Sequence, residues 1–211
     1  MRWGDKRLRN ITYKTSPGVK PEDIDTTEIV LEHFLTPSTR ISASLYHYST
    51  RDLINLALDP NDGLLYYNNL SGVVGQGMEW EAEHRWSNGA QAILSYSLQS
   101  AACDEDQGHA LMNSPSHLLK LHLGVPLWSE QWRAGLETLY MSSRKSRAGE
   151  VHGYTLANLT VSGQWSRNLL FSFGVYNGLN AHYADPVGDN WNQDSLVRDG
   201  RSFRLKLNLR F

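Results

Sequence analysis

The chain has 211 residues and a formal net charge of -2, with 20 basic side chains against 22 acidic ones. This balance excludes a basic nucleic-acid-binding protein and an acidic solvating tail, and a hydrophobic share of 40% excludes a disordered chain. The single cysteine, Cys103, excludes a disulfide framework and a four-cysteine zinc site.

Alternation with a period of two predicts β-strands along most of the chain, because neighbouring side chains of a strand point to opposite faces. In chain order, the predicted strands lie near residues 25–35, 40–58, 64–86, 90–99, 117–125, 131–144, 153–165, 169–177 and 202–211. No segment shows a convincing helical period. The sequence therefore predicts an all-β, antiparallel protein of nine strands.

Two of these strands show the pattern most clearly. The last one places Phe203, Leu205, Leu207, Leu209 and Phe211 on one face and Arg204, Lys206, Asn208 and Arg210 on the other. The segment from Gly77 to Trp86 likewise sets Met78, Trp80, Ala82, His84 and Trp86 against Glu79, Glu81, Glu83 and Arg85. Such faces suit lipid on one side and a wet interior on the other.

The composition agrees with a membrane β-barrel. Hydrophobic residues never continue for about 18 positions, which excludes a transmembrane helix but not barrel strands, since only one strand face is apolar. Seven Trp and ten Tyr against five Phe favour rings at membrane–water interfaces. Residues 1–7 lead into no apolar stretch, so the chain has no predicted secretory signal. We expect either a cytosolic protein or a chain without its natural N-terminus.

The predicted connections alternate in length. Turns at 36–39, 87–89, 126–130 and 166–168 are short, whereas three of the four connections at 59–63, 100–116, 145–152 and 178–201 are long and polar. Outer-membrane barrels have this asymmetry, with short periplasmic turns and long outer loops. A soluble β-sandwich is the alternative for alternating strands.

The tryptophans favour the barrel. Four of the seven gather at the short-turn end, namely Trp86, Trp128, Trp132 and Trp165, while Tyr140 and Tyr154 lie toward the other end. From Trp132 to Tyr140 a strand tilted by about 40° rises roughly 20 Å, close to the apolar band between two aromatic girdles. A sandwich gives no reason for this gathering.

Four stretches resemble, in order, elements of the C-terminal barrel of TonB-dependent receptors, the energised outer-membrane importers of Gram-negative bacteria. Residues 16–22 (SPGVKPE) resemble the NPNLKPE element, with Thr27 and Glu28 at the following strand start, and 75–81 (GQGMEWE) resemble the GxGxExE strand. Residues 176–186 resemble the NLFDxxYxDP loop, although Asn177-Gly178-Leu179-Asn180 lacks its usual Phe and Asp. Residues 200–203 (GRSF) and Phe211 resemble the closing GRxF…F.

The resemblance implies about nine C-terminal strands of a larger barrel of about 22 strands with a plugged lumen. It covers neither the plug and TonB box nor the first part of the barrel. We therefore expect a C-terminal fragment, with residues 1–24 the remnant of an extracellular loop and 25–211 the barrel portion. Since bacterial single-chain barrels are even-stranded, nine strands also argue against a complete small barrel.

The resemblance also implies function and partners. The intact protein would sit in the outer membrane among its lipids and bind a scarce solute at its outer loops, most commonly a ferric siderophore, otherwise cobalamin or a glycan. TonB would act through the missing N-terminal region, and the barrel assembly machinery would recognise the strand ending at Phe211. We expect no nucleic-acid partner and no transport by this chain alone. A porin-like channel or an omptin-like or phospholipase-like barrel enzyme is the alternative.

Candidate site residues are few. Glu79, Glu81 and Glu83 are expected to face the lumen and to pair with basic residues of neighbouring strands such as Lys120 and Arg133, with a ligand or plug contact as the alternative. The acidic residues at 104–106 lack the spacing of a calcium-binding EF-hand loop and are expected to form a solvated loop tip. Cys103 is expected to be free.

Catalytic and metal-binding patterns are absent from the sequence. His117 and His122 are expected on opposite strand faces, and no HExxH spacing occurs. His182, Asp185 and Ser195 share one connection, but nearness in sequence does not make a catalytic triad. We find no GxSxG, GxxxxGK[ST] or helix-opening GxGxxG motif. The sequence therefore predicts no enzyme and no catalytic, cofactor-binding or metal-binding residue.

Overall fold

The computed structural model describes residues 12–103, 111–129, 131–188 and 191–211. Nine long strands form its main sheet: β1 (Asp23–Thr36), β2 (Thr39–Leu58), β3 (Leu65–Arg85), β4 (Gln91–Cys103), β5 (His117–Pro126), β6 (Trp132–Met141), β9 (Tyr154–Ser166), β10 (Leu169–Tyr176) and β13 (Ser202–Leu209). Two short hairpins lie in the connections: β7 (Arg144–Ser146) with β8 (Gly149–Val151), and β11 (Ala184–Pro186) with β12 (Ser195–Val197).

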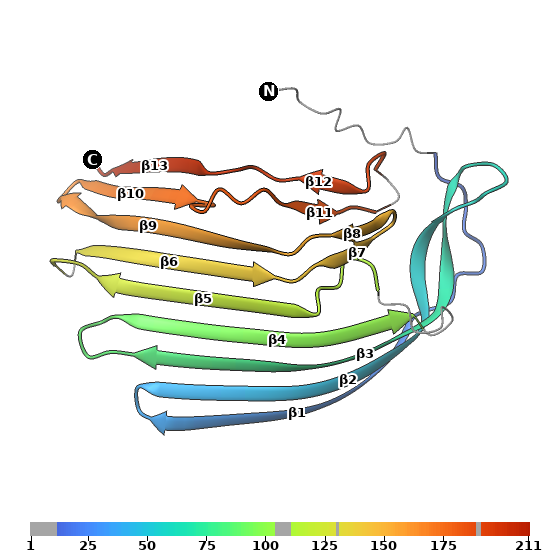
Figure 1. Cartoon of the computed structure of the whole chain (residues 1–211), viewed down its shortest axis with the longest axis horizontal. Helices are drawn as coiled ribbons and strands as arrows, with labels where there is room; N and C mark the ends of the chain where they lie inside the picture. Colours follow the sequence, from blue (N-terminus) through green and yellow to red (C-terminus); the bar gives the residue numbers. More distant parts are fainter. Residues whose placement is uncertain (1–11, 104–110, 130, 189–190) are drawn as a thin grey trace.

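The main sheet is a single curved layer with the strand order β1-β2-β3-β4-β5-β6-β9-β10-β13, and every neighbouring pair is antiparallel (Figure 1). Its edges, β1 and β13, lie at opposite sides of the layer. The β2–β3 hairpin extends past the other strands and bends away from them. The architecture is thus an open segment of an up-and-down β-barrel.

The predicted strands are confirmed, and the described residues contain no helix. The fourth strand runs further than predicted, to Cys103, and the sixth ends earlier, at Met141. The sequence misses the four short strands, because three residues are too few to show a period of two. Across the described ranges, no helix is long and apolar enough to cross a membrane.

The pairing register sorts side chains into two faces. We call the apolar face the one that carries odd-numbered residues of β1, β2, β5, β9, β10 and β13 and even-numbered residues of β3, β4 and β6, and we call the other the polar face. On the apolar face, Ile29, Leu45, Met78 and Leu98 form one cross-strand row. On the polar face, Arg40 pairs with Glu83, Ser95 with Lys120, His122 with Glu137, and Ser172 with Lys206.

The apolar face is not covered by a second layer. Leu31 is 69% exposed and Leu207 is 56% exposed, and the buried hydrophobic residues of the described chain are confined to Leu65, Val73, Ala90 and Ala101. A sandwich would bury such a face against another sheet. The described structure therefore contradicts the sandwich alternative and agrees with a face that meets lipid.

Two glycines explain the strand that resembles GxGxExE. Tyr48 lies opposite Gly75 and Tyr46 opposite Gly77 on the polar face. A Cβ added at Gly75 would lie 2.2 Å from the Tyr48 ring, and one at Gly77 would lie 2.4 Å from the Tyr46 hydroxyl. Only glycine lets both rings lie flat across β3, where the Tyr46 hydroxyl reaches Gln99 Oε1 on β4 at 3.4 Å.

The short turns all lie at one end of the sheet, and the tryptophans cluster there as predicted. The Trp132 ring lies 5.6 Å from that of Trp128, 6.0 Å from that of Trp165 and 5.9 Å from that of Phe171. Trp132 rests on Gly163, where a Cβ would lie 2.4 Å from the indole. Trp128 is 75% exposed and Trp165 is 71% exposed, as suits rings at a membrane interface.

Tyr140 and Tyr154 lie toward the long-connection end of β6 and β9, as predicted. Tyr140 pairs with Thr155, and Met141 with Tyr154, so the two tyrosines lie on opposite faces of the sheet. Tyr140 shares the apolar face with Trp132, while the Tyr154 ring stacks near Tyr183 at a centroid distance of 4.5 Å. Adjacent strand ends suggest one level, but the register decides which face a ring takes.

Candidate functional site

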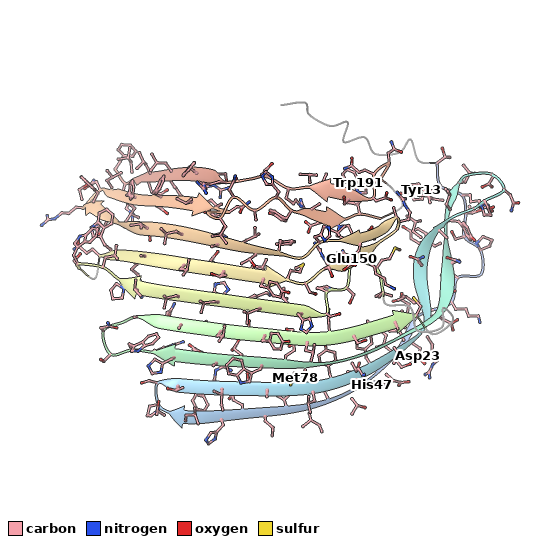
Figure 2. All side chains as sticks on the ribbon, in the orientation of Figure 1. Tyr13, Asp23, His47, Met78, Glu150 and Trp191 are labelled. Carbon is pink, nitrogen blue, oxygen red and sulfur yellow. The ribbon has the colours of Figure 1, made fainter. Side chains whose placement is uncertain are left out.

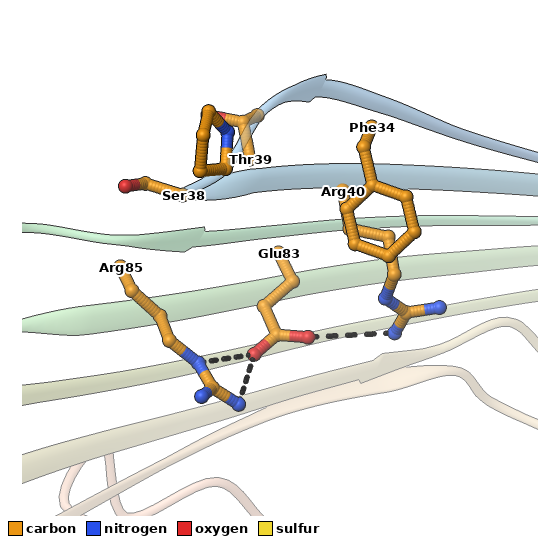
Figure 3. A pocket seen from close by; sticks show the side chains of 7 residues that line it. Phe34, Ser38, Thr39, Arg40, Glu83 and Arg85 are labelled. Carbon is orange, nitrogen blue, oxygen red and sulfur yellow. Dashed lines mark hydrogen bonds and ion pairs between the residues drawn. The ribbon is translucent and has the colours of Figure 1, made fainter.

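Charged side chains on the polar face gather near the short-turn end of β1, β2 and β3. The Arg40 guanidinium bonds to Glu81 Oε1 at 2.5 Å, to Glu32 Oε2 at 3.1 Å and to Glu83 Oε2 at 3.5 Å. Arg85 Nε donates to Glu83 Oε1 at 2.8 Å (Figure 3). Figure 3 shows Arg40, Glu83 and Arg85 of this network beside Phe34. These four residues line a cavity of about 280 Å³.

These contacts correct the predicted partners of the glutamates. Glu81 and Glu83 lie on the polar face as expected, but they pair with Arg40 and Arg85 rather than with Lys120 and Arg133. The register gives the reason, because Arg40 lies directly opposite Glu83, whereas Ser95 of β4 separates Glu81 from Lys120. Arg133 instead donates to the Gly89 carbonyl at 2.8 Å.

A wider depression of about 400 Å³ lies next to this network on the polar face. Its lining includes the charged residues Glu28, Glu79, Glu81 and Lys120, separated by Ser42, Ser44, Ser95 and Ser97. The short serines leave the carboxylates accessible on the polar face. The wall can thus accept hydrogen-bond donors and cations from a body inside the barrel.

A second cluster joins three of the outer connections. The Arg144 side chain, only 6% exposed, donates to Asn113 Oδ1 at 3.0 Å, to the Ala184 carbonyl at 3.2 Å and to Asp185 Oδ1 at 2.8 Å. Asn113 follows β4, Arg144 follows β6 and Asp185 follows β10. One guanidinium therefore ties together connections that lie far apart in the sequence.

Asp185 completes this cluster from the other side. Its second oxygen accepts from Arg198 Nε at 2.6 Å, and Tyr154 Oη lies 3.4 Å from its first. Desolvation would raise the pKa of the Asp185 carboxyl, but the hydrogen bonds from Arg144 and Arg198 outweigh it and hold that pKa below its ordinary value. We call Asn113, Arg144, Tyr154, Tyr183, Asp185 and Arg198 the outer-loop hub.

Aromatic rings support the outer-loop hub. The Arg144 guanidinium lies 5.7 Å from the centre of the Tyr154 ring, which in turn packs against Tyr183. Burial, followed by the negative charge of Asp185, raises the pKa of the Tyr183 hydroxyl above its ordinary value. Tyr183 thus stays a neutral donor at physiological pH. The hub accounts for the YxDP part of the sequence resemblance, since Tyr183 and Asp185 both belong to it.

The preceding turn is organised by Asn177 and Asn180, and Asn180 stands where the resembled loop has its Asp. Asn177 is buried, has a φ of 48°, and exchanges hydrogen bonds with the backbone of Ala181 at 2.8 and 2.9 Å. Asn180 has a φ of 53° and accepts from the Arg201 amide at 2.9 Å. A Cβ at Gly200 would lie 2.9 Å from Asn180 Oδ1, so a larger residue there would displace this acceptor. Asparagine tolerates the left-handed backbone that this turn needs.

The stretch at 16–22 is tied to the extended β2–β3 hairpin. Ser16 Oγ accepts from the Tyr67 amide at 2.7 Å, Lys20 exchanges two hydrogen bonds with Asn69, and Glu22 accepts from the Ile54 amide at 2.7 Å. Lys14 binds Asp59 and Asp62 at the hairpin tip. Residues 12–22 therefore run along β3 before β1 begins at Asp23.

The remaining predicted residues occupy separate places. His117 lies on the apolar face, 2.8 Å from the Tyr96 hydroxyl, and His122 lies on the polar face, 3.8 Å from Glu137, as predicted. Cys103 is a free thiol at the end of β4, and the acidic residues at 104–106 lie outside the described residues. No group of His, Cys, Asp and Glu in the described part could hold a metal ion.

Asp185, His182 and Ser195 do not make a relay in the described structure. The Asp185 oxygens bind Arg144, Arg198 and Tyr154. His182 and Ser195 line a cavity of about 330 Å³ beside β8, and Asp185 is not among its lining residues. Sequence reasoning also misses Arg40 and Arg144. The position of Arg40 opposite the glutamate strand could have been found from the hairpin register, whereas nothing local marks Arg144.

Comparison with known proteins identifies the fold. The family described as TonB dependent receptor-like, beta-barrel matches residues 7–177. No curated protein sequence matches the chain. Among solved structures, the chain is similar to the ferric-catecholate import receptor Fiu from K12 E. coli, with 20% identity and a TM-score of 0.70 over 95% of this chain and 30% of that one.

Two further structures have the same fold. The copper transporter OprC shows 17% identity and a TM-score of 0.73, with 95% of this chain and 34% of that chain covered. The pyoverdine receptor FpvA from Pseudomonas aeruginosa PAO1 shows 15% identity and a TM-score of 0.73, with 95% and 31% covered. The chain therefore spans about a third of the length of these structures. Because the family match covers most of its residues, the chain belongs to the β-barrel family of TonB-dependent receptors.

Proposed function

We propose that this chain forms part of the wall of an outer-membrane receptor that imports a scarce solute with energy supplied through TonB. The observation that carries the proposal is the family match over residues 7–177 together with a sheet whose apolar and polar faces follow the strand register. Residues 25–211 would be barrel wall, and residues 1–24 would belong to an outer connection. TonB would act through a segment outside these strands.

The proposed solute is a ferric siderophore. Named binding partners of the similar structures support this class, since one is a ferric-catecholate receptor and another was solved with pyoverdine. The outer-loop hub supports the receptor role, because it holds three outer connections in one arrangement and so prepares a surface before a ligand arrives. The proposed location is the outer membrane of a Gram-negative bacterium, and β13 with Phe211 is the proposed contact of the barrel assembly machinery.

Iron uptake in cells tests this proposal. Cells that carry the gene for this chain and cells from which it is deleted would be given ⁵⁵Fe-labelled catecholate, hydroxamate and pyoverdine-type siderophores, with and without a protonophore. We expect deletion to abolish energy-dependent uptake of one siderophore class and to leave the others unchanged. Unchanged uptake of every siderophore would contradict the proposed solute. Loss of cobalamin or copper uptake alone would keep the importer but reject the siderophore.

A further inference from the structure

Two Asn-Gly pairs occur in the sequence, and the structure places them in opposite surroundings. Asn88-Gly89 forms the exposed turn between β3 and β4, at the short-turn end of the sheet. Asn177-Gly178 follows β10 toward the outer connections, the end at which Figure 2 labels Glu150 and Trp191. Asparagine before glycine is prone to lose its side-chain amide, because glycine has no Cβ to keep its backbone nitrogen away from the asparagine Cγ.

The loss of ammonia from Asn88 would begin when the Gly89 nitrogen gives up its proton and attacks Asn88 Cγ. Negative charge then moves onto Oδ1, the bond from Cγ to Nδ2 breaks, and the departing nitrogen takes up the proton and leaves as ammonia. Water opens the resulting cyclic imide at either carbonyl and gives aspartate or isoaspartate. A structure favours this path when it stabilises the anionic nitrogen and the developing oxyanion and leaves the departing amide free.

The turn at Asn88 meets these three conditions. The Ala90 amide donates to Asn88 Oδ1 at 3.0 Å, so a donor already faces the atom on which negative charge develops. The Arg133 guanidinium donates to the Gly89 carbonyl at 2.8 Å, which holds a positive charge near the attacking nitrogen and favours its anionic form. Among the described residues, Asn88 Nδ2 has no hydrogen-bond partner.

The same turn leaves room for the ring to close. Gly89 has a φ of 81°, and apart from its chain neighbours no atom lies within 4 Å of the place where its Cβ would be. The Gly89 amide donates to the Trp86 carbonyl at 3.0 Å, and this bond must open before the attack. Because the bond lies in an exposed turn, it can open without unfolding of the sheet.

Asn177 is held in a way that blocks the same chemistry. Its Nδ2 donates to the Ala181 carbonyl at 2.9 Å and to the Asp199 carbonyl at 3.3 Å, and the residue is only 5% exposed. The Gly178 amide donates to the Ala157 carbonyl at 2.7 Å. The departing amide and the attacking nitrogen are thus both tied, and little water reaches the side chain.

We propose that Asn88-Gly89 is a site of spontaneous deamidation that the Ala90 amide and the Arg133 guanidinium assist, while Asn177-Gly178 remains intact. The product carries a carboxylate in the turn beside Arg133. Its isoaspartate form also lengthens the backbone of the turn, which the Trp86 amide closes on the Ala90 carbonyl at 2.9 Å. The proposal rests on these turn contacts and not on the identity of the imported solute.

Peptide mass mapping of the whole folded protein in a mild detergent tests the proposal. The protein is incubated in H₂¹⁸O at neutral pH and digested in ordinary water, so that modification during digestion is not counted. The peptide with Asn88 should gain one solvent oxygen and appear as aspartate and isoaspartate forms. The peptide with Asn177 should react at least about tenfold more slowly, because its side-chain hydrogen bonds must break first. An unmodified Asn88, or equal rates at the two pairs, would overturn the proposal.

Two comparisons separate the structure from the dipeptide. In urea both pairs should react at similar rates, and an Asn177 that stays slow when unfolded would show that the folded contacts are not the cause. Arg133→Gln should slow the reaction at Asn88 about threefold through the lost positive charge. Arg167→Gln, in another short turn, should not change it and is the matched control. Both variants should migrate as heat-modifiable barrels, and an unchanged or faster reaction in Arg133→Gln would contradict the assistance by Arg133.

Discussion

Asp185→Asn should open the outer-loop hub while leaving the membrane strands intact. The substitution keeps the shape of the side chain but removes the charge that Arg144 and Arg198 share. Arg144 would then keep a guanidinium that is only 6% exposed and has no carboxylate partner. Arg198 is 47% exposed and can turn to water, so most of the cost falls on Arg144.

The expected cost follows from the burial of this pair. Removing one partner of a buried ion pair destabilises by about 3–5 kcal/mol, and since Asp185 is 22% exposed we take the lower end, about 3 kcal/mol. Because the hub lies in the connections, this energy should appear as local opening rather than as global unfolding. At about 1.4 kcal/mol per tenfold, amide exchange in the hub should accelerate roughly 100-fold.

Hydrogen–deuterium exchange followed by mass spectrometry measures this effect. Peptides around Asn113 and β11 should lose protection, whereas peptides from β6 and β9 should not change. Asp194→Asn is the matched control, because the Arg147–Asp194 pair joins neighbouring connections at 2.9 Å but is 31% and 42% exposed, so its loss should cost at most about 1 kcal/mol. If amide exchange in the hub peptides is equal in Asp185→Asn and Asp194→Asn, Asp185 is not the residue that holds the hub together.

Four further outcomes are expected. Folding lowers the pKa of the Asp185 carboxyl, so its contribution to the stability of the hub is complete above the ordinary carboxyl pKa of about 4. That contribution is lost as the pH falls through the lower folded pKa. Amide exchange in the hub should therefore rise below about pH 4 in the wild type but not in Asp185→Asn. Leu207→Arg should destabilise the barrel by about 2–4 kcal/mol in denaturant titrations if it lies near the midplane, while Lys206→Leu should be nearly neutral, and the reverse order would contradict the assigned faces of β13. Deletion of Phe211 should lower the amount of assembled protein in outer-membrane fractions more than the stability of what assembles. The purified chain alone in liposomes should give no reproducible channel in conductance recordings, and discrete monomeric channels would contradict that expectation.

The strands and their faces could be predicted because apolar and polar side chains alternate with a period of two residues along each strand. Phe203 to Phe211 alternate with basic residues so cleanly that both the strand and its facing follow from steric geometry alone. The end of the sheet that carries the short turns could be predicted equally well, since Trp128, Trp132 and Trp165 cluster where the chain reverses. These features are local, so a single sequence contains them.

The contacts that build the candidate sites could not be predicted in the same way. Arg144 binds Asp185, which lies 41 positions further along the sequence. Nothing in the local sequence shows that Arg144, rather than the nearby Lys145 or Arg147, makes this ion pair. Its burial comes from two hairpins that are each too short to show a period. Long-range pairing of this kind depends on how connections fold back over the sheet, which alternation does not encode.

The direction of the edge strands constrains what can complete this sheet. Nine antiparallel strands place β1 and β13 in the same direction. If a second copy of this sheet were added in the same orientation, its β1 would lie parallel to β13 of the first copy, and its β13 would lie parallel to β1 of the first copy. The all-antiparallel pairing of bacterial barrels would then be lost at both contacts between the copies. Since those barrels have an even number of strands, the strands that complete this sheet must be odd in number and must begin and end opposite in direction to β1 and β13. Backbone groups left unpaired in lipid cost several kcal/mol each, so the open edges favour such a complement strongly over the isolated sheet.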